Sequence, residues 1–371
     1  MRNILMITTS LDVGGVEKMI LLLAKELKNR SYKIIVASSG GALVNELRRL
    51  GIRHYCLPLD QNKKSIFSFI RSLVAIWKII ISEKIDIIHT HHRWATFVSC
   101  IPARILRVPL VTTDHSLLAG KKYFTVWGDR VIAVSNTSKG HLIDYFKVDS
   151  NKITVVHNCI TFDESNPEKA NETLVQAKAM GIGRNFPIIL NIGRMVKDKG
   201  QEYFILAAKE VLATKPDTQF IIIGDGLERE KLEKLVKDFP MRKKFFFLGE
   251  QKDISGFLSI MDFLVVPSLR EGFGLVALEA FYFGKPVIAS NIGGLSEIVK
   301  DQYNGLLVQS ASVEDLRQAI LLLLGDFSLR LRMGENAKKY LTDNFKVKNT
   351  VDGVEKVYLD LCAKNNFCAC H

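Results

Sequence analysis

Two segments of the chain share one layout, an apolar strand followed by a glycine loop and then an apolar-periodic helix. The first has Gly14 and Gly15 after an apolar stretch at residues 3–9, and the second has Gly193 after an apolar stretch at residues 187–192. A doubly wound α/β domain with a parallel sheet begins in this way. The chain has 371 residues, enough for two domains with separate cores. The sequence therefore predicts two such domains.

Further apolar runs of strand length alternate with helical patterns, as the crossovers of a parallel sheet require. The predicted strands span residues 33–38, 85–89, 110–113, 130–134 and 152–156 in the first half, and 220–223, 245–248, 263–267, 286–289 and 305–308 in the second. The polar stretch at residues 161–185 is interpreted as a linker with one short helix, and residues 351–363 as an amphipathic helix. We place the domains at residues 1–165 and 166–349.

Two glutamates eight positions apart flank a glycine turn that opens a helix in the second half. Glu271 precedes Gly274, and Glu279 follows inside the helix. A glycine loop at a helix start presents free backbone N–H groups and the positive end of the helix dipole, which suits a phosphate. The two carboxylates can accept hydrogen bonds from hydroxyl groups on either side of that anion. A diphosphate between two hydroxyl-rich rings is a nucleotide sugar, and the pattern predicts this ligand.

The composition narrows the class of partner. The net charge of +12 favours anionic partners, but the basic residues are scattered and no zinc-finger or ribonucleoprotein motif occurs, which argues against nucleic acid. A phosphorylated substrate or an anionic membrane surface fits better. The N-terminal apolar run is too short for a signal peptide, and no stretch reaches the roughly 18 uninterrupted apolar residues of a spanning helix. We expect a cytoplasmic protein, with peripheral placement at the inner face of the cell membrane as the alternative.

Six motifs occur in an order and spacing that resembles the retaining GT-B glycosyltransferases of family 4 (GT4), the group 1 glycosyl transferases. They are Gly14-Gly-Val-Glu17, Gly193-Arg194 with Lys199-Gly200, Gly224-Asp-Gly226, Gly249-Glu-Gln-Lys-Asp253, Glu271 with Glu279, and Asn304-Gly-Leu-Leu-Val308. The resemblance covers nearly the whole chain. It implies an α/β fold with two Rossmann-like, doubly wound parallel-sheet domains facing a central cleft. The N-terminal domain would bind the acceptor and take back the last helix, about residues 350–371, and the C-terminal domain would bind the nucleotide-sugar donor.

The resemblance assigns catalytic roles to four side chains. Arg194 and Lys199 clamp the donor diphosphate and stabilise the charge that builds on the leaving group. Glu271 faces the hydroxyl groups of the donor sugar, and His115 lies near the reacting carbon. The simpler interpretations, an exposed basic loop and a loop or capping histidine, stay open.

Seven further positions are assigned to the donor by the same resemblance. Glu279 contacts the ribose, and the backbone N–H groups of Gly274 and Leu275 contact the diphosphate. Gly15, without a side chain, lets the backbone approach the ligand. The remaining donor-binding residues are Gly193, Gly224 and Gln251.

The sequence contains no Asp-x-Asp pair that would hold a divalent ion. Two cations, Arg194 and Lys199, together with helix-end amides can replace such an ion, so we expect no metal and no cofactor beyond the nucleotide-sugar co-substrate. The histidines within residues 89–92 resemble metal ligands but lie at a strand end. The cysteines within residues 362–370 fit no common zinc spacing, and we interpret this tail as a frayed terminus.

One helical pattern, at residues 65–81, has two interpretations. Its large apolar residues follow helical spacing: Ile66, Phe69, Ile70, Leu73, Ile76, Trp77 and Ile80. Four cations lie away from that stripe: Lys63, Lys64, Arg71 and Lys78. A basic amphipathic helix would touch a membrane and reach a lipid-linked acceptor. A crossover helix would pack the stripe on the sheet, and the strands on both sides favour this second interpretation.

We therefore expect a metal-independent retaining glycosyltransferase of the hexosyltransferase type. It would move a sugar from a nucleotide sugar, with UDP as the commonest nucleotide, to a carbohydrate or lipid-linked acceptor in bacterial surface polysaccharide or glycolipid assembly. No residue stands out as a covalent nucleophile, so the front-face mechanism proposed for the family is the working assumption. The alternatives are another GT-B activity, such as a nucleotide-sugar epimerase, and a non-catalytic nucleotide-sugar-binding partner of a transferase.

Overall fold

The chain divides into two units, Met1–Cys159 with Val347–His371, and Ile160–Lys346. The computed structural model describes residues 2–12, 14–59, 65–117, 125–161, 167–183 and 185–365. The predicted boundaries are residues 165 and 349, whereas the chain passes from one unit to the other after residues 159 and 346. The cysteine-containing tail beyond residue 365 lies outside the described residues.

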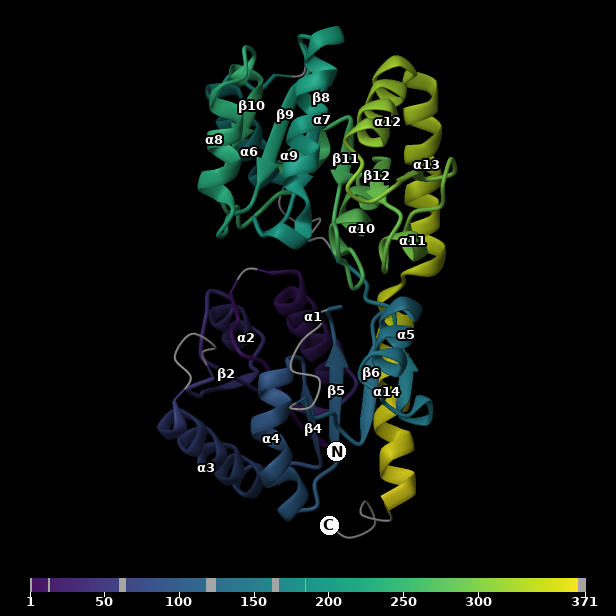
Figure 1. Ribbon diagram of the computed structural model, residues 1–371. Helices are drawn as coiled ribbons and strands as arrows, with labels where there is room; N and C mark the ends of the chain where they lie inside the picture. Colours follow the sequence, from purple (N-terminus) through teal and green to yellow (C-terminus); the bar gives the residue numbers. More distant parts are fainter. Residues whose placement is uncertain are drawn as a thin grey trace. The chain divides into compact units, whose positions relative to one another are not determined.

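The first unit contains a seven-stranded parallel sheet in the order β3-β2-β1-β4-β5-β6-β7 (Figure 1). Its strands are β1 (Asn3–Ile7), β2 (Lys33–Ser38), β3 (Arg53–Cys56), β4 (Ile87–Thr90), β5 (Leu110–Asp114), β6 (Arg130–Ala133) and β7 (Ile153–Val155). Strand β1 pairs with both β2 and β4, so the strand order reverses at β1. Loops at such a reversal diverge and leave room for a ligand at the carboxyl ends of the strands.

Helices cover both faces of this sheet. They are α1 (Gly15–Asn29), α2 (Val44–Arg49), α3 (Ile66–Ser82), α4 (Arg93–Ile105), α5 (Asn136–Asp144) and α14 (Val347–Asn365). Ile4 and Met6 of β1 pack with α1 and α14, whereas Leu5 and Ile7 pack with α3 and α4. Alternate residues of a strand point to opposite faces, so β1 is buried on both sides.

The last helix, α14, completes the core of the first unit. Tyr358 is fully buried, and its hydroxyl lies 2.6 Å from Nδ1 of His89 on β4. The other ring nitrogen of His89 lies 2.7 Å from Oγ1 of Thr113. His89 thus has both nitrogens satisfied inside the protein, which gives it a structural role.

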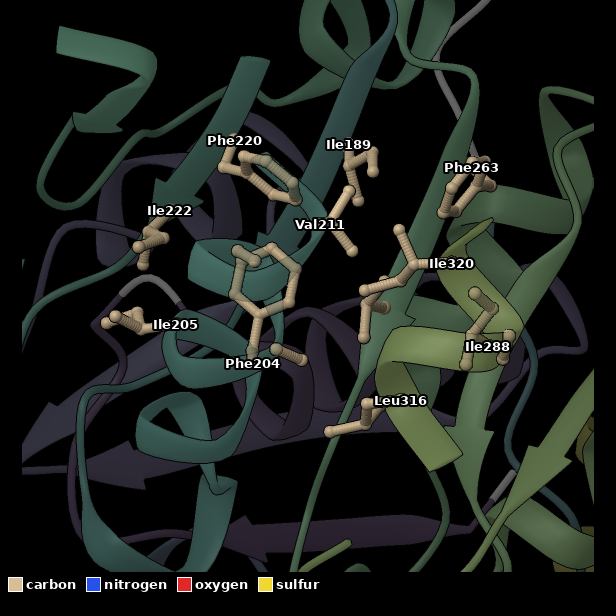
Figure 2. Close-up of a cluster of buried hydrophobic side chains, with 14 of the residues drawn as sticks. Ile189, Phe204, Ile205, Val211, Phe220, Ile222, Phe263, Ile288, Leu316 and Ile320 are labelled. Carbon is tan, nitrogen blue, oxygen red and sulfur yellow. The ribbon is translucent and has the colours of Figure 1, made fainter. Parts of the chain in front are cut away.

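The second unit contains a six-stranded parallel sheet in the order β10-β9-β8-β11-β12-β13. Its strands are β8 (Ile188–Ile192), β9 (Gln219–Ile223), β10 (Phe245–Phe247), β11 (Phe263–Val266), β12 (Val287–Ser290) and β13 (Gly305–Val308). Its helices are α6 (Pro167–Ala179), α7 (Gln201–Thr214), α8 (Arg229–Lys237), α9 (Ser255–Ile260), α10 (Leu275–Tyr282), α11 (Leu295–Ile298), α12 (Val313–Gly325) and α13 (Phe327–Asn344). Figure 2 shows Phe204 of α7 and Ile320 of α12 packed over the strands. The ring centroids of Phe204 and Phe220 lie 5.7 Å apart.

The predicted fold class, two doubly wound α/β domains with parallel sheets, is confirmed. One strand was not predicted, β3 (Arg53–Cys56), whose residues are only partly buried or exposed. This strand lies at the edge of its sheet and pairs only with β2 among the described strands. An edge strand needs fewer apolar side chains, so the apolar pattern that marks the other strands is missing.

Helix α3 buries a different stripe from the predicted one. Ile76 and Ile80 are buried as expected, and Ile79 joins them. Ile66 and Ile70, expected on the sheet, are instead 75% and 52% exposed. The helix is apolar nearly all round, so its periodicity alone could not say which side meets the sheet.

Glu83, just after α3, joins three strand residues at the sheet edge. Its carboxylate lies 2.8 Å from Nζ of Lys33 and accepts a 2.6 Å hydrogen bond from the Tyr55 hydroxyl. It also forms an ion pair with Arg53. The carboxylate is only 4% exposed, and hydrogen bonds from Lys33 and Tyr55 lower its pKa to about 2. Glu83 thus links the end of α3 to strands β2 and β3.

We predict that Glu83→Gln lowers the melting temperature at pH 7 by about 2–8 °C, because lost charged hydrogen bonds cost about 1–2 kcal/mol. The pKa of Glu83 is lowered from about 4.5 to about 2 on folding. Its stabilisation is therefore complete above about pH 4.5 and is lost as the pH falls towards 2. Thermal melts from pH 7 down to 3 should show the two proteins converging below pH 4.5.

The matched control is Glu202→Gln, because Glu202 pairs with Lys231 on the surface, where ion pairs contribute little. The control should melt like the parent at every pH. A Glu83→Gln protein that melts like the parent at pH 7 would contradict the proposed role.

Candidate functional site

An ion pair lies at the carboxyl ends of two neighbouring strands in the second unit. Nζ of Lys199, after β8, lies 2.7 Å from Oε2 of Glu271, after β11. The hydroxyl of Ser268 lies 3.3 Å from the same carboxylate oxygen. The side chains of Lys199 and Glu271 are 29% and 13% exposed, so the pair remains open to solvent. Because β8 and β11 are adjacent, their loops bring together residues 72 positions apart.

The loop that carries Lys199 is held tightly against the loop that carries Glu271. Gly200 has a φ of +65°, and a Cβ there would lie 2.0 Å from the carbonyl oxygen of Pro267. The carbonyl of Asp198 accepts a 2.8 Å hydrogen bond from the backbone N–H of Leu269. Only glycine permits this approach, so Gly200 fixes the distance between the two loops.

Gln201 positions the start of the same loop from inside the protein. It is 2% exposed, and its amide nitrogen donates to the carbonyls of Gly193 and Arg194 at 3.3 and 3.2 Å. The Arg194 side chain is exposed and forms no ion pair with any residue that the structure describes. Gln201 was not predicted, since its role depends on loop carbonyls that no spacing pattern identifies. Arg194 is thus an exposed cation whose backbone carbonyl is held by Gln201.

Helix α10 begins beside Glu271 with unpaired amides. Gly274 has a φ of +106°, and a Cβ on it would lie 2.6 Å from the side chain of Leu295 and 3.6 Å from Cγ of Glu271. Within the described ranges, the backbone N–H groups of Gly274, Leu275 and Val276 have no hydrogen-bond acceptor. Such amides at a helix start suit an anion. Glu279 lies partly buried further along α10.

The other predicted donor-binding residues of this unit lie on neighbouring loops. A Cβ on Gly224, after β9, would lie 2.1 Å from the Gly193 carbonyl oxygen, so these two loops touch. Gln251, after β10, donates a 2.7 Å hydrogen bond to the carbonyl of Leu248. Gln251 therefore braces its own loop, and the donor-binding roles of all three residues stay predictions.

The first unit carries His115, which pairs with a second histidine. Nε2 of His115, directly after β5, lies 3.3 Å from Nδ1 of His91, and the two rings stack with centroids 5.6 Å apart. Burial lowers the pKa of His115 to about 3 and that of His91 well below its usual range. Both imidazoles are therefore neutral and can bind a hydroxyl group, but they supply no permanent positive charge.

A small cavity of about 20 Å³ lies beside the two histidines, with room for one water-sized group. Its lining is mainly apolar, with Met19 and Leu23 among its residues. Nε2 of His91 and Nδ1 of His115 are buried and have no hydrogen-bond partner in the described part of the chain. The adjacent carboxyl group of Asp114 is also buried, which raises its pKa to about 6. His91 and Asp114 were not predicted as site residues, although His91 lies in the histidine cluster noted at residues 89–92.

Gly15, also in the first unit, is the exposed first residue of α1. The N-cap of this helix, Gly14, supplies no side-chain hydrogen bond. Within the described ranges, no group of three or more His, Cys, Asp or Glu side chains is arranged to hold a metal ion.

Comparison with known proteins shows that both halves of the chain match glycosyltransferase families. Residues 13–164 match the family described as Glycosyltransferase Family 4, and residues 175–340 match Glycosyl transferases group 1. An uncharacterised glycosyltransferase of Methanocaldococcus jannaschii is 32% identical over 368 residues, covering 94% of this chain and 95% of the relative.

A second relative and a solved structure are also similar over nearly their full lengths. The UDP-Gal:alpha-D-GlcNAc-diphosphoundecaprenol alpha-1,3-galactosyltransferase of Escherichia coli is 28% identical over 368 residues, covering 94% of each chain. The crystal structure of a glycosyltransferase from Rickettsia africae has a TM-score of 0.82 at 26% identity, covering 98% of this chain and 99% of that one. The predicted family and the GT-B fold are confirmed, and this chain belongs to the group 1, family 4 glycosyltransferases.

Proposed function

We propose that this glycosyltransferase is a retaining enzyme that uses a UDP-sugar as donor and a carbohydrate or lipid-linked molecule as acceptor. The observation that carries the proposal is the grouping of Lys199, Glu271 and the unpaired amides at Gly274 and Leu275. This grouping offers positive charge and N–H donors to a diphosphate, with a carboxylate beside it for sugar hydroxyl groups.

The charges of the site fit a diphosphate leaving group without a divalent ion. In the structure, Glu271 neutralises Lys199, and the side chain of Arg194 is exposed. A bound diphosphate would share Lys199 with Glu271 and draw in Arg194. Lys199 and Arg194 would then stabilise the negative charge that develops as the sugar–phosphate bond breaks.

The proposed reaction takes place on one face of the sugar. The bond between the anomeric carbon and the phosphate oxygen breaks, and the acceptor oxygen bonds to the same face. The departing phosphate oxygen takes the proton of the acceptor hydroxyl, so the products are the glycosylated acceptor and a protonated nucleoside diphosphate. Ion pairing with Lys199 and the hydrogen bond from Ser268 fix Glu271 in place, which suits orientation of the sugar better than nucleophilic attack.

The donor and acceptor classes rest on the Escherichia coli relative. Its name gives UDP-Gal as the donor and a diphosphoundecaprenol-linked sugar as the acceptor. We propose the same classes here, in surface polysaccharide or glycolipid assembly on the cytoplasmic side of a bacterial membrane. Contacts between Glu271 and the hydroxyl groups of the donor sugar would select that sugar.

The stereochemical outcome tests the proposal directly. Candidate UDP-sugars are first screened by thermal shift, and the binding donor is incubated with undecaprenol-diphosphate sugars. Proton NMR of the first product should show the anomeric configuration of the donor retained. Inversion would refute the retaining assignment, conversion of the donor to its epimer without acceptor would favour an epimerase, and binding without turnover would favour a non-catalytic partner.

We predict that Lys199→Ala or Glu271→Ala lowers turnover at least about a hundredfold, as loss of a strong electrostatic contact in the transition state would. The assay measures the initial transfer rate at saturating donor, below the melting transition of each variant. Lys197→Ala is the matched control, because Lys197 is exposed on the same turn and forms no ion pair with any described residue. Near-parental turnover of the Lys199 or Glu271 variant would remove that residue from the proposed site.

We also predict that the enzyme works without a divalent ion. After treatment with EDTA and removal of the chelator, the transfer rate should equal that of untreated protein. A metal that bridges the diphosphate contributes several kcal/mol, so a metal-dependent enzyme would slow by about a hundredfold or more. Such a loss, restored by Mg²⁺ or Mn²⁺, would contradict the assigned roles of Arg194 and Lys199.

A further inference from the structure

Helix α3 exposes a row of large apolar side chains. Five of them lie on its outer side, with exposed fractions between 49% and 75%: Ile66, Phe67, Ile70, Val74 and Ile81. At 3.6 residues per turn, these positions fall within a sector of about 100° and extend over about 22 Å of helix. Scattered apolar side chains are ordinary on a protein surface, but an aligned row along a whole helix marks a binding surface.

The inner side of α3 already has its partners, so the outer row is not needed for packing. Ile76, Ile79 and Ile80 pack against the sheet in the core of the first unit. Phe69 packs against α4, with its ring centroid 6.0 Å from that of Trp94 and 5.7 Å from that of Phe97. A helix that is apolar on both sides needs a second apolar partner.

The neighbouring helix α4 also exposes large apolar side chains. It packs beside α3 (Figure 1), and its outer residues include Ile101 and Ile105, which are 43% and 58% exposed. Arg104, which precedes Ile105 in the sequence, is also exposed. Two helices that pack together thus both expose large apolar side chains.

The charges on these helices are all positive. Neither α3 nor α4 contains an aspartate or a glutamate. Arg71 and Lys78 are exposed on α3 beside the apolar row, and Arg71 lies over the ring of Phe67 at 5.8 Å. The nearest acid in the sequence, Glu83, is buried and paired with Lys33. Two helices with large exposed apolar side chains, and with only cations among their own charged residues, complement an anionic interface.

We propose that the exposed face of α3 and α4 docks the enzyme on an anionic lipid bilayer, with α3 lying in the plane of the interface. The apolar row would enter the acyl boundary while Arg71, Lys78 and Arg104 contact lipid phosphates. No helix in the described ranges is long and apolar enough to cross a membrane. Docking would bring the site to a lipid-linked acceptor, and only this consequence rests on the proposed function.

Vesicle co-sedimentation tests the proposal without donor or acceptor, so its failure leaves the transferase assay unaffected. The full-length protein should bind vesicles of phosphatidylcholine with phosphatidylglycerol, and binding should weaken in high salt and be absent from phosphatidylcholine alone. Phe67→Glu/Ile70→Glu should weaken binding at least about tenfold, since it removes two inserted side chains. Arg71→Gln/Lys78→Gln should weaken it by about tenfold or more.

Two matched controls separate this face from general surface effects. Phe327→Glu/Leu331→Glu changes two side chains of α13 that are 68% and 54% exposed, and Lys338→Gln/Lys339→Gln removes two exposed lysines of that helix. Both controls should bind vesicles like the parent, and all variants should keep the parental melting temperature because the altered side chains are exposed.

Three results would overturn the proposal. Absence of parental binding to anionic vesicles would exclude lipid docking, and undiminished binding of both α3 variants would place any docking elsewhere. Light scattering that shows a dimer of the parent and a monomer of Phe67→Glu/Ile70→Glu, with no vesicle binding, would assign the face to a second copy of the chain.

Discussion

Parallel pairing governs where the functional groups of this protein lie. All the strand pairs that the structure describes in the two sheets are parallel. Each connection must therefore run back over one face of the sheet, so that the next strand begins at the same end. The loops after β8 and β11 therefore emerge side by side, and they bring Lys199 to Glu271. In the other unit, the same rule places His91 after β4 and His115 after β5. In each unit, the strand order thus decides which side chains meet.

The ion pair of Lys199 and Glu271 keeps both groups in place before a ligand arrives. Without Glu271, the long side chain of Lys199 could adopt many rotamers. Glu271 holds it within 2.7 Å, and the contact of Gly200 with Pro267 fixes the backbones behind both residues. An anion can then enter a site whose cation is already positioned. Because the Lys199 side chain is already ordered, less conformational entropy is lost when the ligand binds.

Sequence reasoning predicted most of the fold and only part of the site. Buried strands such as β1 and β8 are short apolar runs, which the pattern shows directly, whereas edge strand β3 lacks that pattern. Ile66 and Ile70 of α3 were wrongly expected on the sheet, because apolar residues occur on both sides of this helix and the periodicity does not say which side packs. Glu271 was predicted from the local pattern with Gly274 and Glu279, whereas Lys199 came from resemblance to a family, since no local spacing links two residues 72 positions apart. Gln201 acts on backbone carbonyls, which only the folded loop presents.

The return of α14 to the first unit makes the second unit an insertion within it. Residues 160–346 form one contiguous stretch, so the second unit can fold as soon as it leaves the ribosome. The first unit cannot complete its core until α14 has been synthesised, because Val351, Val354 and Tyr358 fill the cluster beneath α1. Until they arrive, that cluster stays open to water and His89 lacks the Tyr358 hydroxyl. During synthesis the second unit is thus complete before the first unit. A fragment that ends at residue 159 would lack α14 and would expose the apolar residues that α14 covers.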